Sequence, residues 1–183
     1  ATMLNKLRKL NKRRGFTLVE LMIVVVIIGI LAALAIMGIA KYTRAAKTTE
    51  AKAQIDKIVK LADLAYFEDR GTNADPAEGT VILTNQLCPS VAKTPGSAPP
   101  SAKITLNEAQ WTPWKACLGF EINGPQYYSY TYDATGNASY VATANGDLDG
   151  DTTESTFSRS AIVDADNGRI MKQAVIWENL AEE

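Results

Sequence analysis

The sequence has no histidine and only two cysteines among its 183 residues. Histidine is the side chain that most often moves protons near neutral pH, so acid–base catalysis by histidine is excluded. No nucleotide-binding loop, nucleophile–base pair or catalytic metal set is recognisable either. These absences argue against an enzyme and against an ATPase motor.

Polar side chains are also absent from residues 21–40, a run of twenty apolar residues. As an α-helix this run would be about 30 Å long, which is roughly the thickness of the hydrocarbon core of a bilayer. Its β-branched residues favour a strand in water, but in lipid a helix satisfies its own backbone polar groups. The run therefore predicts a membrane-spanning helix rather than a core helix of a soluble protein.

The net charge of −1 conceals an asymmetry, because residues 1–15 carry six positive charges and the remainder has a net charge of −7. Positive flanks stay in the cytoplasm, so we expect a single span of the inner membrane with the acidic remainder outside. That acidity disfavours nucleic acid, and no sequence-specific nucleic-acid partner is expected. Cys88 and Cys117 both lie in the outward part, where a disulfide would close a loop worth about 3–4 kcal/mol.

A single carboxylate, Glu20, precedes the apolar run in the sequence Lys12-Arg13-Arg14-Gly15-Phe16-Thr17-Leu18-Val19-Glu20. No small-residue cleavage site closes the run, as it would in a secretory signal peptide. This segment resembles the type IV pilin family. The resemblance lies in the basic leader, the glycine, the phenylalanine after it, the glutamate, and the uninterrupted apolar helix with Gly29 and residues 30–33. This family supplies the subunits of bacterial pili and of the pseudopili of type II secretion. The resemblance covers roughly the first 55 residues.

The resemblance implies that a prepilin peptidase cuts after Gly15 and that the new amine of Phe16 is methylated. It also implies that Glu20 pairs with the Phe16 amine of a neighbouring subunit in a homopolymer. An inner-membrane assembly platform and its ATPase would build the filament, which would leave through an outer-membrane secretin in a Gram-negative cell. The small residues Gly29 and Ala33 would let helices approach closely. The alternative for Glu20 is a carboxylate that snorkels to the lipid headgroups.

Many pilins have a proline at the position of Met37, so a sharp kink there is not expected in this chain. Beyond the apolar run, residues 41–66 contain neither glycine nor proline, and their apolar side chains recur with helical period. We predict one helix from about Thr17 to about Phe67, ended by Gly71 and residues 73–76, with Leu64 pointing away from the buried stripe.

The remainder predicts a globular domain of the α+β class, in which an antiparallel sheet of about four strands covers the amphipathic part of the helix. Residues 71–125 are expected to be loop-rich, with a short strand near residues 80–83 and with Trp111 and Trp114 packed beneath the loop. The domain organisation is then a leader (1–15), a hydrophobic helix (16–43) and a globular domain (44–183). Alternating residues predict the four strands at 126–134, 138–144, 155–165 and 169–177.

An acidic loop joins the second and third of these strands. Asp147, Asp149 and Asp151 alternate as they do at the start of a calcium-binding loop. The helix–loop–helix calcium motif fails, because Thr152 and Ser158 occupy positions that require glycine and glutamate. An irregular calcium site and a solvated turn both remain open.

The function predicted from these features is that of a structural subunit of a type IV pilus. The first alternative is a major pseudopilin of a type II secretion system. An alternative of another class is a single-pass membrane protein with a periplasmic binding or sensing domain, which would not be cut at Gly15. The residues leave open whether the fibre serves twitching motility, adhesion, DNA uptake or secretion.

Overall fold

The computed structural model describes residues 15–68, 70–75, 80–99 and 102–179. The chain divides into two compact units, Ala1–Tyr42 and Thr43–Glu183, and helix α2 (Leu18–Phe67) contributes residues to both. Residues 1–14 of the predicted leader lie outside the described residues. The α+β class predicted from the sequence is confirmed.

Helix α2 begins one residue after the predicted Thr17 and ends at the predicted Phe67. It continues without a break through Met37, the position at which a proline would stand in many pilins. In the first unit every described side chain from Gly15 to Tyr42 is exposed, including those of the apolar run. By length and composition this segment can cross a membrane, as the sequence predicts.

The second half of α2 forms one wall of the core of the second unit. Leu64 is 69% exposed, as its position off the apolar stripe predicts. The buried face follows the helical period seen in the sequence. Its members are Ala51, Ile55, Ile58, Val59, Ala62, Ala65 and Tyr66.

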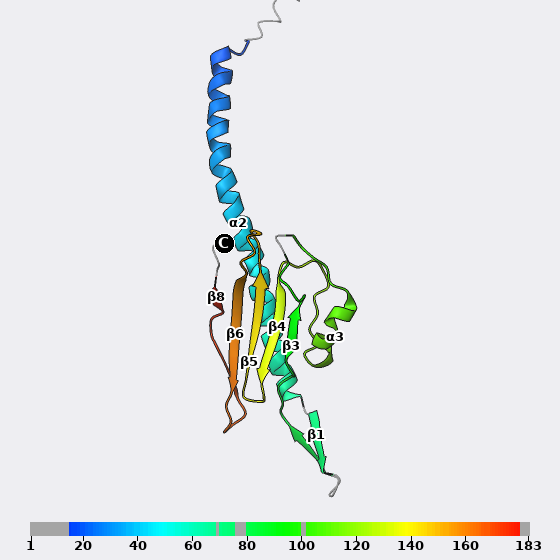
Figure 1. Cartoon of the computed structure of the whole chain (residues 1–183). Helices are drawn as coiled ribbons and strands as arrows, with labels where there is room; N and C mark the ends of the chain where they lie inside the picture. Colours follow the sequence, from blue (N-terminus) through cyan, green and yellow to red (C-terminus); the bar gives the residue numbers. More distant parts are fainter. Residues whose placement is uncertain (1–14, 69, 76–79, 100–101, 180–183) are drawn as a thin grey trace, which may run out of the picture. The chain divides into compact units, whose positions relative to one another are not determined.

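An antiparallel sheet packs one face against this stripe (Figure 1). Its strands follow the order β3 (Val91–Thr94), β4 (Ser129–Thr135), β5 (Ser139–Gly146), β6 (Ser155–Val163) and β7 (Ile170–Lys172), and β8 (Trp177–Asn179) also pairs with β6. The first three predicted strands correspond to β4, β5 and β6. The predicted fourth strand is divided, because β7 and β8 pair with opposite ends of β6.

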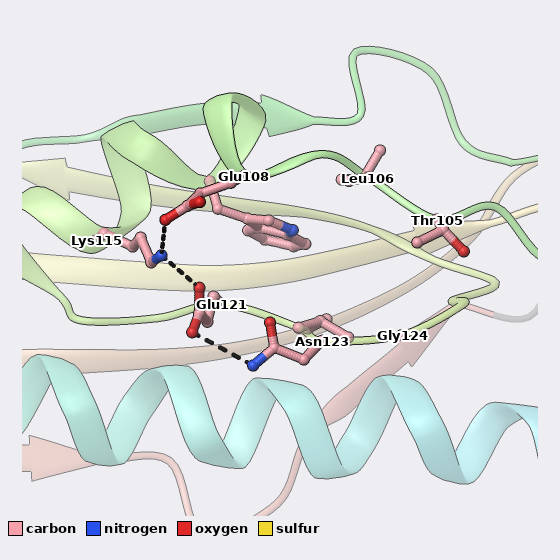
Figure 2. A pocket seen from close by; sticks show the side chains of 9 residues that line it. Thr105, Leu106, Glu108, Lys115, Glu121, Asn123 and Gly124 are labelled. Carbon is pink, nitrogen blue, oxygen red and sulfur yellow. Dashed lines mark hydrogen bonds and ion pairs between the residues drawn. The ribbon is translucent and has the colours of Figure 1, made fainter.

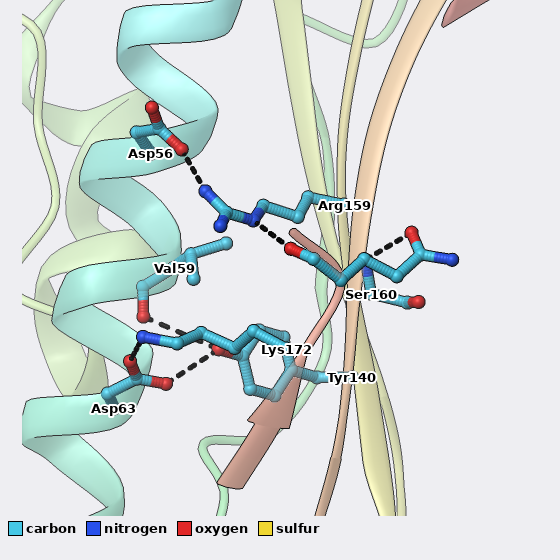
Figure 3. Close-up of polar contacts among 8 residues, drawn as sticks. Asp56, Val59, Asp63, Tyr140, Arg159, Ser160 and Lys172 are labelled. Atoms are coloured by element: carbon cyan, nitrogen blue, oxygen red, sulfur yellow. Dashed lines mark hydrogen bonds and ion pairs between the residues drawn. The ribbon is translucent and has the colours of Figure 1, made fainter. Parts of the chain in front are cut away.

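Polar contacts fasten α2 to the sheet (Figure 3). Arg159 on β6 pairs with Asp56 on α2. About two turns further along the helix, the Tyr140 hydroxyl donates to Asp63 Oδ1 at 2.8 Å, and Lys172 Nζ lies 2.5 Å from Asp63 Oδ2. Burial, then the hydrogen bond to Asp63, raises the pKa of Tyr140 above its ordinary value. These contacts fix which helical turn faces which strand.

The region predicted to be mostly loop contains more regular structure than expected. Strands β1 (Arg70–Asp75) and β2 (Thr80–Thr84) form a two-stranded antiparallel sheet, and α3 (Glu108–Cys117) is a ten-residue helix. The predicted end of the long helix near Phe67 is confirmed, and Gly71, expected to help end it, lies four residues further on in β1. The strand predicted near residues 80–83 is confirmed as β2.

Candidate functional site

The start of α2 is stabilised by a reciprocal pair of hydrogen bonds between Thr17 and Glu20. The backbone N–H of Glu20 donates to Thr17 Oγ1 at 3.2 Å, while the backbone N–H and hydroxyl of Thr17 both donate to Glu20 Oε2 at 2.9 Å. This is a capping box, which satisfies backbone N–H groups that a helix start would otherwise leave unpaired. The Thr17-x-x-Glu20 spacing is the sequence signal from which this cap could have been predicted.

The two oxygens of Glu20 differ in their hydrogen bonding. Oε2 accepts both bonds from Thr17, whereas Oε1 accepts none from any described residue. Gly15, Phe16 and Thr17 precede the helix and are exposed, with Phe16 81% exposed. The structure therefore brings together an accessible, non-helical Gly15–Phe16 peptide and a carboxylate with one oxygen available for a further partner.

The disulfide between Cys88 and Cys117 is present, as predicted, with the two Cα atoms 5.7 Å apart. It ties the segment before β3 to the last residue of α3. Trp111 and Trp114 on α3 are buried, and their ring centroids lie 5.6 and 5.1 Å from that of Phe120. These tryptophans pack in the core, as predicted, and leave no exposed ring face on which a sugar could stack.

A hollow of about 520 Å³ lies between α3 and the segment that follows it, and a row of charges lines it (Figure 2). Lys115 Nζ lies 3.0 Å from Glu108 Oε1 and 2.7 Å from Glu121 Oε2. The hydrogen bonds from Lys115 and then Asn123 lower the pKa of the Glu121 carboxyl, and Glu121 and then Glu108 raise the pKa of Lys115. The lysine and the two carboxylates satisfy one another, so this network supplies no group poised for proton transfer.

The predicted calcium ligands Asp147, Asp149 and Asp151 do come together, with ligand oxygens of all three within 4.8 Å of one another. We call residues 147–151 the acidic turn. Each of the three carboxylates accepts a backbone N–H: Asp147 from Gly150 and Thr152, Asp149 from Asp151, and Asp151 from Thr153. These bonds account for the shape of the turn without a cation.

Comparisons with known proteins agree with the features of the N-terminal segment. A family model described as the prokaryotic N-terminal methylation motif matches residues 10–39. The chain is 44% identical over 64 residues to the type IV major pilin protein PilA of Myxococcus xanthus, a match that covers 35% of this chain and 29% of the relative. It is 46% identical over 71 residues to a fimbrial protein of Dichelobacter nodosus, covering 38% of this chain and 44% of that protein.

The chain thus spans less than half the length of these two relatives. A longer match joins it to the type IV major fimbrial protein FimA of Dichelobacter nodosus, at 35% identity over 111 residues, or 55% of this chain and 69% of that protein. No solved structure matched the chain. Because the FimA match extends well beyond the apolar helix, the chain belongs to the type IV pilin family.

Proposed function

We propose that this chain is the structural subunit of a type IV pilus, cleaved after Gly15 and polymerised through its N-terminal helix. The observation that carries the proposal is the helix segment of the first unit, whose described apolar side chains are all exposed. Such a surface needs either lipid or other copies of itself around it. A filament of pilins provides the second environment when the helix leaves the membrane.

Glu20 would set the register between copies in this proposal. Cleavage after Gly15 turns the amide nitrogen of Phe16 into an amine, whose positive charge is kept on methylation. A carboxylate and an amine attract strongly at low dielectric, whereas an unpaired charge there is strongly penalised. Because the cap uses Oε2 alone, Oε1 can accept the amine of a neighbour without breaking the cap.

The cellular route follows from the same proposal. The precursor would cross the inner membrane once with its N-terminus in the cytoplasm, and the prepilin peptidase would act on the exposed Gly15–Phe16 bond. The assembly platform and its ATPase would then supply the work of extraction, since members of the family are structural subunits rather than enzymes. The finished filament would be extracellular and would need no cofactor.

Two variants of Glu20 separate its charge from its hydrogen bonds. Glu20→Gln keeps an acceptor at the third helical position, which a capping box tolerates, but it removes the charge. Glu20→Ala removes both. We expect both variants to insert into the membrane and both to lose most filaments in pilus-assembling cells, counted by electron microscopy and by sheared-fibre yield. Abundant normal filaments from Glu20→Gln would show that charge pairing is not required.

Processing is tested by mass spectrometry of the N-terminus. A chain that begins with methylated Phe16 supports the pilin, whereas an intact leader in cells with the peptidase supports the membrane-anchored binding or sensing protein. Pili in which this chain is the dominant protein would favour a major pilin over a pseudopilin.

Calcium binding by Asp147, Asp149 and Asp151 is a second proposal. The proximity of three carboxylates supports it, because a hard divalent cation would relieve their repulsion. The backbone bonds to the same carboxylates support a turn that needs no ion.

A further inference from the structure

We propose that the second unit contains a lysine clamp, formed by Lys47, Lys103 and Tyr127, that binds the phosphates of anionic phospholipid headgroups on the outer face of the inner membrane. The inference rests on the proposed function only in taking the N-terminal helix as a membrane span. It concerns the subunit before it enters a filament, and it is carried by two cations that converge on one aromatic ring.

Two ammonium groups from distant parts of the sequence lie against the ring of Tyr127. Lys47 Nζ, on α2, lies 4.5 Å from the ring centroid, and Lys103 Nζ, in the segment between β3 and α3, lies 4.9 Å from it. The two charges are therefore within about 10 Å of each other, roughly one Debye length at 0.1 M salt. The aromatic face attracts each cation, but it does not neutralise either charge.

Hydrogen bonds of the backbone hold the members of the clamp in place. The N–H of Tyr127 donates to Glu50 Oε1 at 2.8 Å, one helical turn beyond the lysine on α2. Ile104 and Gln126, the residues that follow Lys103 and precede the tyrosine, exchange two backbone hydrogen bonds of 3.0 and 2.8 Å. The convergence of the two lysines is therefore set by the backbone and not by their flexible side chains alone.

Neither lysine of the clamp has a carboxylate as an ion-pair partner among the described residues. Glu50 is the nearest acid along α2, and one of its oxygens already accepts the N–H of the clamp tyrosine. Other lysines of the same unit do find carboxylates, at 2.5–3.0 Å, namely Lys52, Lys93, Lys115 and Lys172. The clamp thus presents positive charge that the described chain leaves without a counter-charge, which suits an anionic ligand.

The position of the clamp in the chain selects a membrane lipid as that ligand. Lys47 comes seven residues after Ala40, the last residue of the apolar run, which is about 10 Å along a helix. The headgroup layer covers the hydrocarbon core to a depth of about 5–8 Å on each side. Lysine side chains near a membrane interface extend their ammonium groups into this layer. The clamp is therefore within reach of lipid phosphates whenever the apolar run spans the bilayer.

The charge pattern beside the clamp also points to an anionic surface. The first charged residues after the apolar run are Lys41, Arg44 and Lys47, and the first acid comes only at position 50. Residues 16–183 as a whole carry a net charge of −7. Cations directly outside a span oppose the rule that keeps positive flanks in the cytoplasm, so they require a separate cause. Attraction to anionic headgroups supplies it.

The attraction is weak for each charge but sufficient for a unit that is already tethered. Each lysine near an anionic membrane surface strengthens binding roughly fivefold, so two lysines give about 25-fold. Because the N-terminal helix keeps the unit beside the bilayer, the effective concentration of headgroups is high. In the precursor the clamp holds the globular unit at the membrane surface, and it releases the lipid when assembly draws the helix out.

Acylation of lysines in the full chain, reconstituted into vesicles, tests the inference. A membrane-impermeant reagent is added to vesicles of phosphatidylcholine alone and to vesicles that also contain phosphatidylglycerol, and mass spectrometry gives the reaction rate of each lysine. Lys60 is the internal reference, since it is exposed on α2 and has no ion pair among the described residues. Relative to this reference, we expect Lys47 and Lys103 to react about fivefold more slowly in the anionic vesicles, and high salt should remove the difference.

Two variants distinguish the clamp from a general effect of the membrane surface. In Lys47→Gln the protection of Lys103 should be mostly lost, because the phosphate no longer has two donors. Arg169→Gln removes one positive charge at an exposed position outside the clamp and should leave that protection unchanged. Protection of Lys103 that persists in Lys47→Gln would overturn the inference.

The remaining outcomes separate the inference from the proposed function. Equal relative rates in the two kinds of vesicle would overturn the inference and leave the pilus function standing. Equal protection of the detergent-solubilised chain by inorganic phosphate would mean a site for free anions and would overturn the assignment to lipid. A chain that inserts into neither kind of vesicle would overturn the membrane span of the proposed function and this inference with it.

Discussion

Two tyrosines of the sheet, Tyr130 and Tyr140, offer a matched test of the packing between the sheet and α2. Both are fully buried. The Tyr140 hydroxyl donates to Asp63, whereas the Tyr130 hydroxyl has no hydrogen-bond partner among the described residues. Replacing each by phenylalanine removes the same atom from two buried sites that differ in hydrogen bonding.

We expect the two replacements to change the free energy of unfolding by clearly different amounts, and with opposite signs where the loss of the Tyr130 hydroxyl is stabilising. Tyr140→Phe removes a hydrogen bond to a charged acceptor, which is worth about 1.5–3 kcal/mol of unfolding free energy. Asp63 would retain Lys172, so the loss should not exceed that range. Tyr130→Phe removes a buried hydroxyl without a partner, so we expect the free energy of unfolding to stay unchanged or to rise by up to about 1 kcal/mol.

The second unit is suited to this measurement, since its core lies entirely within residues 51–161 and it contains all three tryptophans. Urea unfolding of residues 43–183, followed by tryptophan fluorescence, gives the free energy of unfolding for each variant, and equal denaturant slopes show that the unfolded states are comparable. In double-mutant cycles with Asp63→Asn, the change in unfolding free energy of Tyr140→Phe should depend on whether Asp63 is present. The change caused by Tyr130→Phe should simply add to that of Asp63→Asn. A loss at Tyr130 as large as that at Tyr140 would refute the reasoning.

Three further predictions concern the same unit. Burial is the main cause that raises the pKa of both Tyr130 and Tyr140. Folding therefore favours the protonated hydroxyls. The contribution of each tyrosine to the free energy of unfolding is complete below about pH 10 and falls above it by about 1.4 kcal/mol per pH unit. If the free energy of unfolding of the double phenylalanine variant fell with pH as steeply as that of the unmodified unit, the prediction would be contradicted. Gly146→Ala would place Cβ 2.4 Å from Tyr128 Cε1. We expect it to destabilise the unit by about 1–3 kcal/mol in urea unfolding, whereas Gly124→Ala, which meets no atom within 4 Å, should be nearly neutral. For the acidic turn, millimolar calcium should raise the unfolding temperature of the unit and a chelator should reverse the change; an unchanged temperature rejects the calcium site.

The elements that could be predicted are those whose pattern is local and long. The apolar run and the stripe from Ala51 to Tyr66 define α2, and alternation over seven or more residues defines β4, β5 and β6. The disulfide could be predicted because the sequence has only two cysteines and both lie in the segment expected to face outward. In each case the sequence contains the physical cause within one short window.

The elements that were missed depend on distant partners. Helix α3 contains Pro113, which disfavours a helix, and it is held by the Asn107–Gln110 capping box and by burial of its two tryptophans. Strands β3, β7 and β8 have only three or four residues and exist because an edge of the sheet is available to them. Such short pairings carry no period of their own, so tertiary contacts decide them.

Glu20 shows how the structure changes an interpretation that the sequence alone supports. From charge alone, the carboxylate would be unpaired in the membrane until a neighbouring amine reached it. The cap shows that Thr17 already gives one of its oxygens two hydrogen bonds within the same chain. Hydrogen bonds to the charged form lower the penalty of holding that charge near lipid. Under the proposed function, the precursor would therefore hold its ionised glutamate at a lower cost before Phe16 becomes an amine. The gain on assembly would be smaller than full relief of a bare charge, because the bonds to Oε2 already exist and assembly would add the counter-charge of the amine and a bond at Oε1.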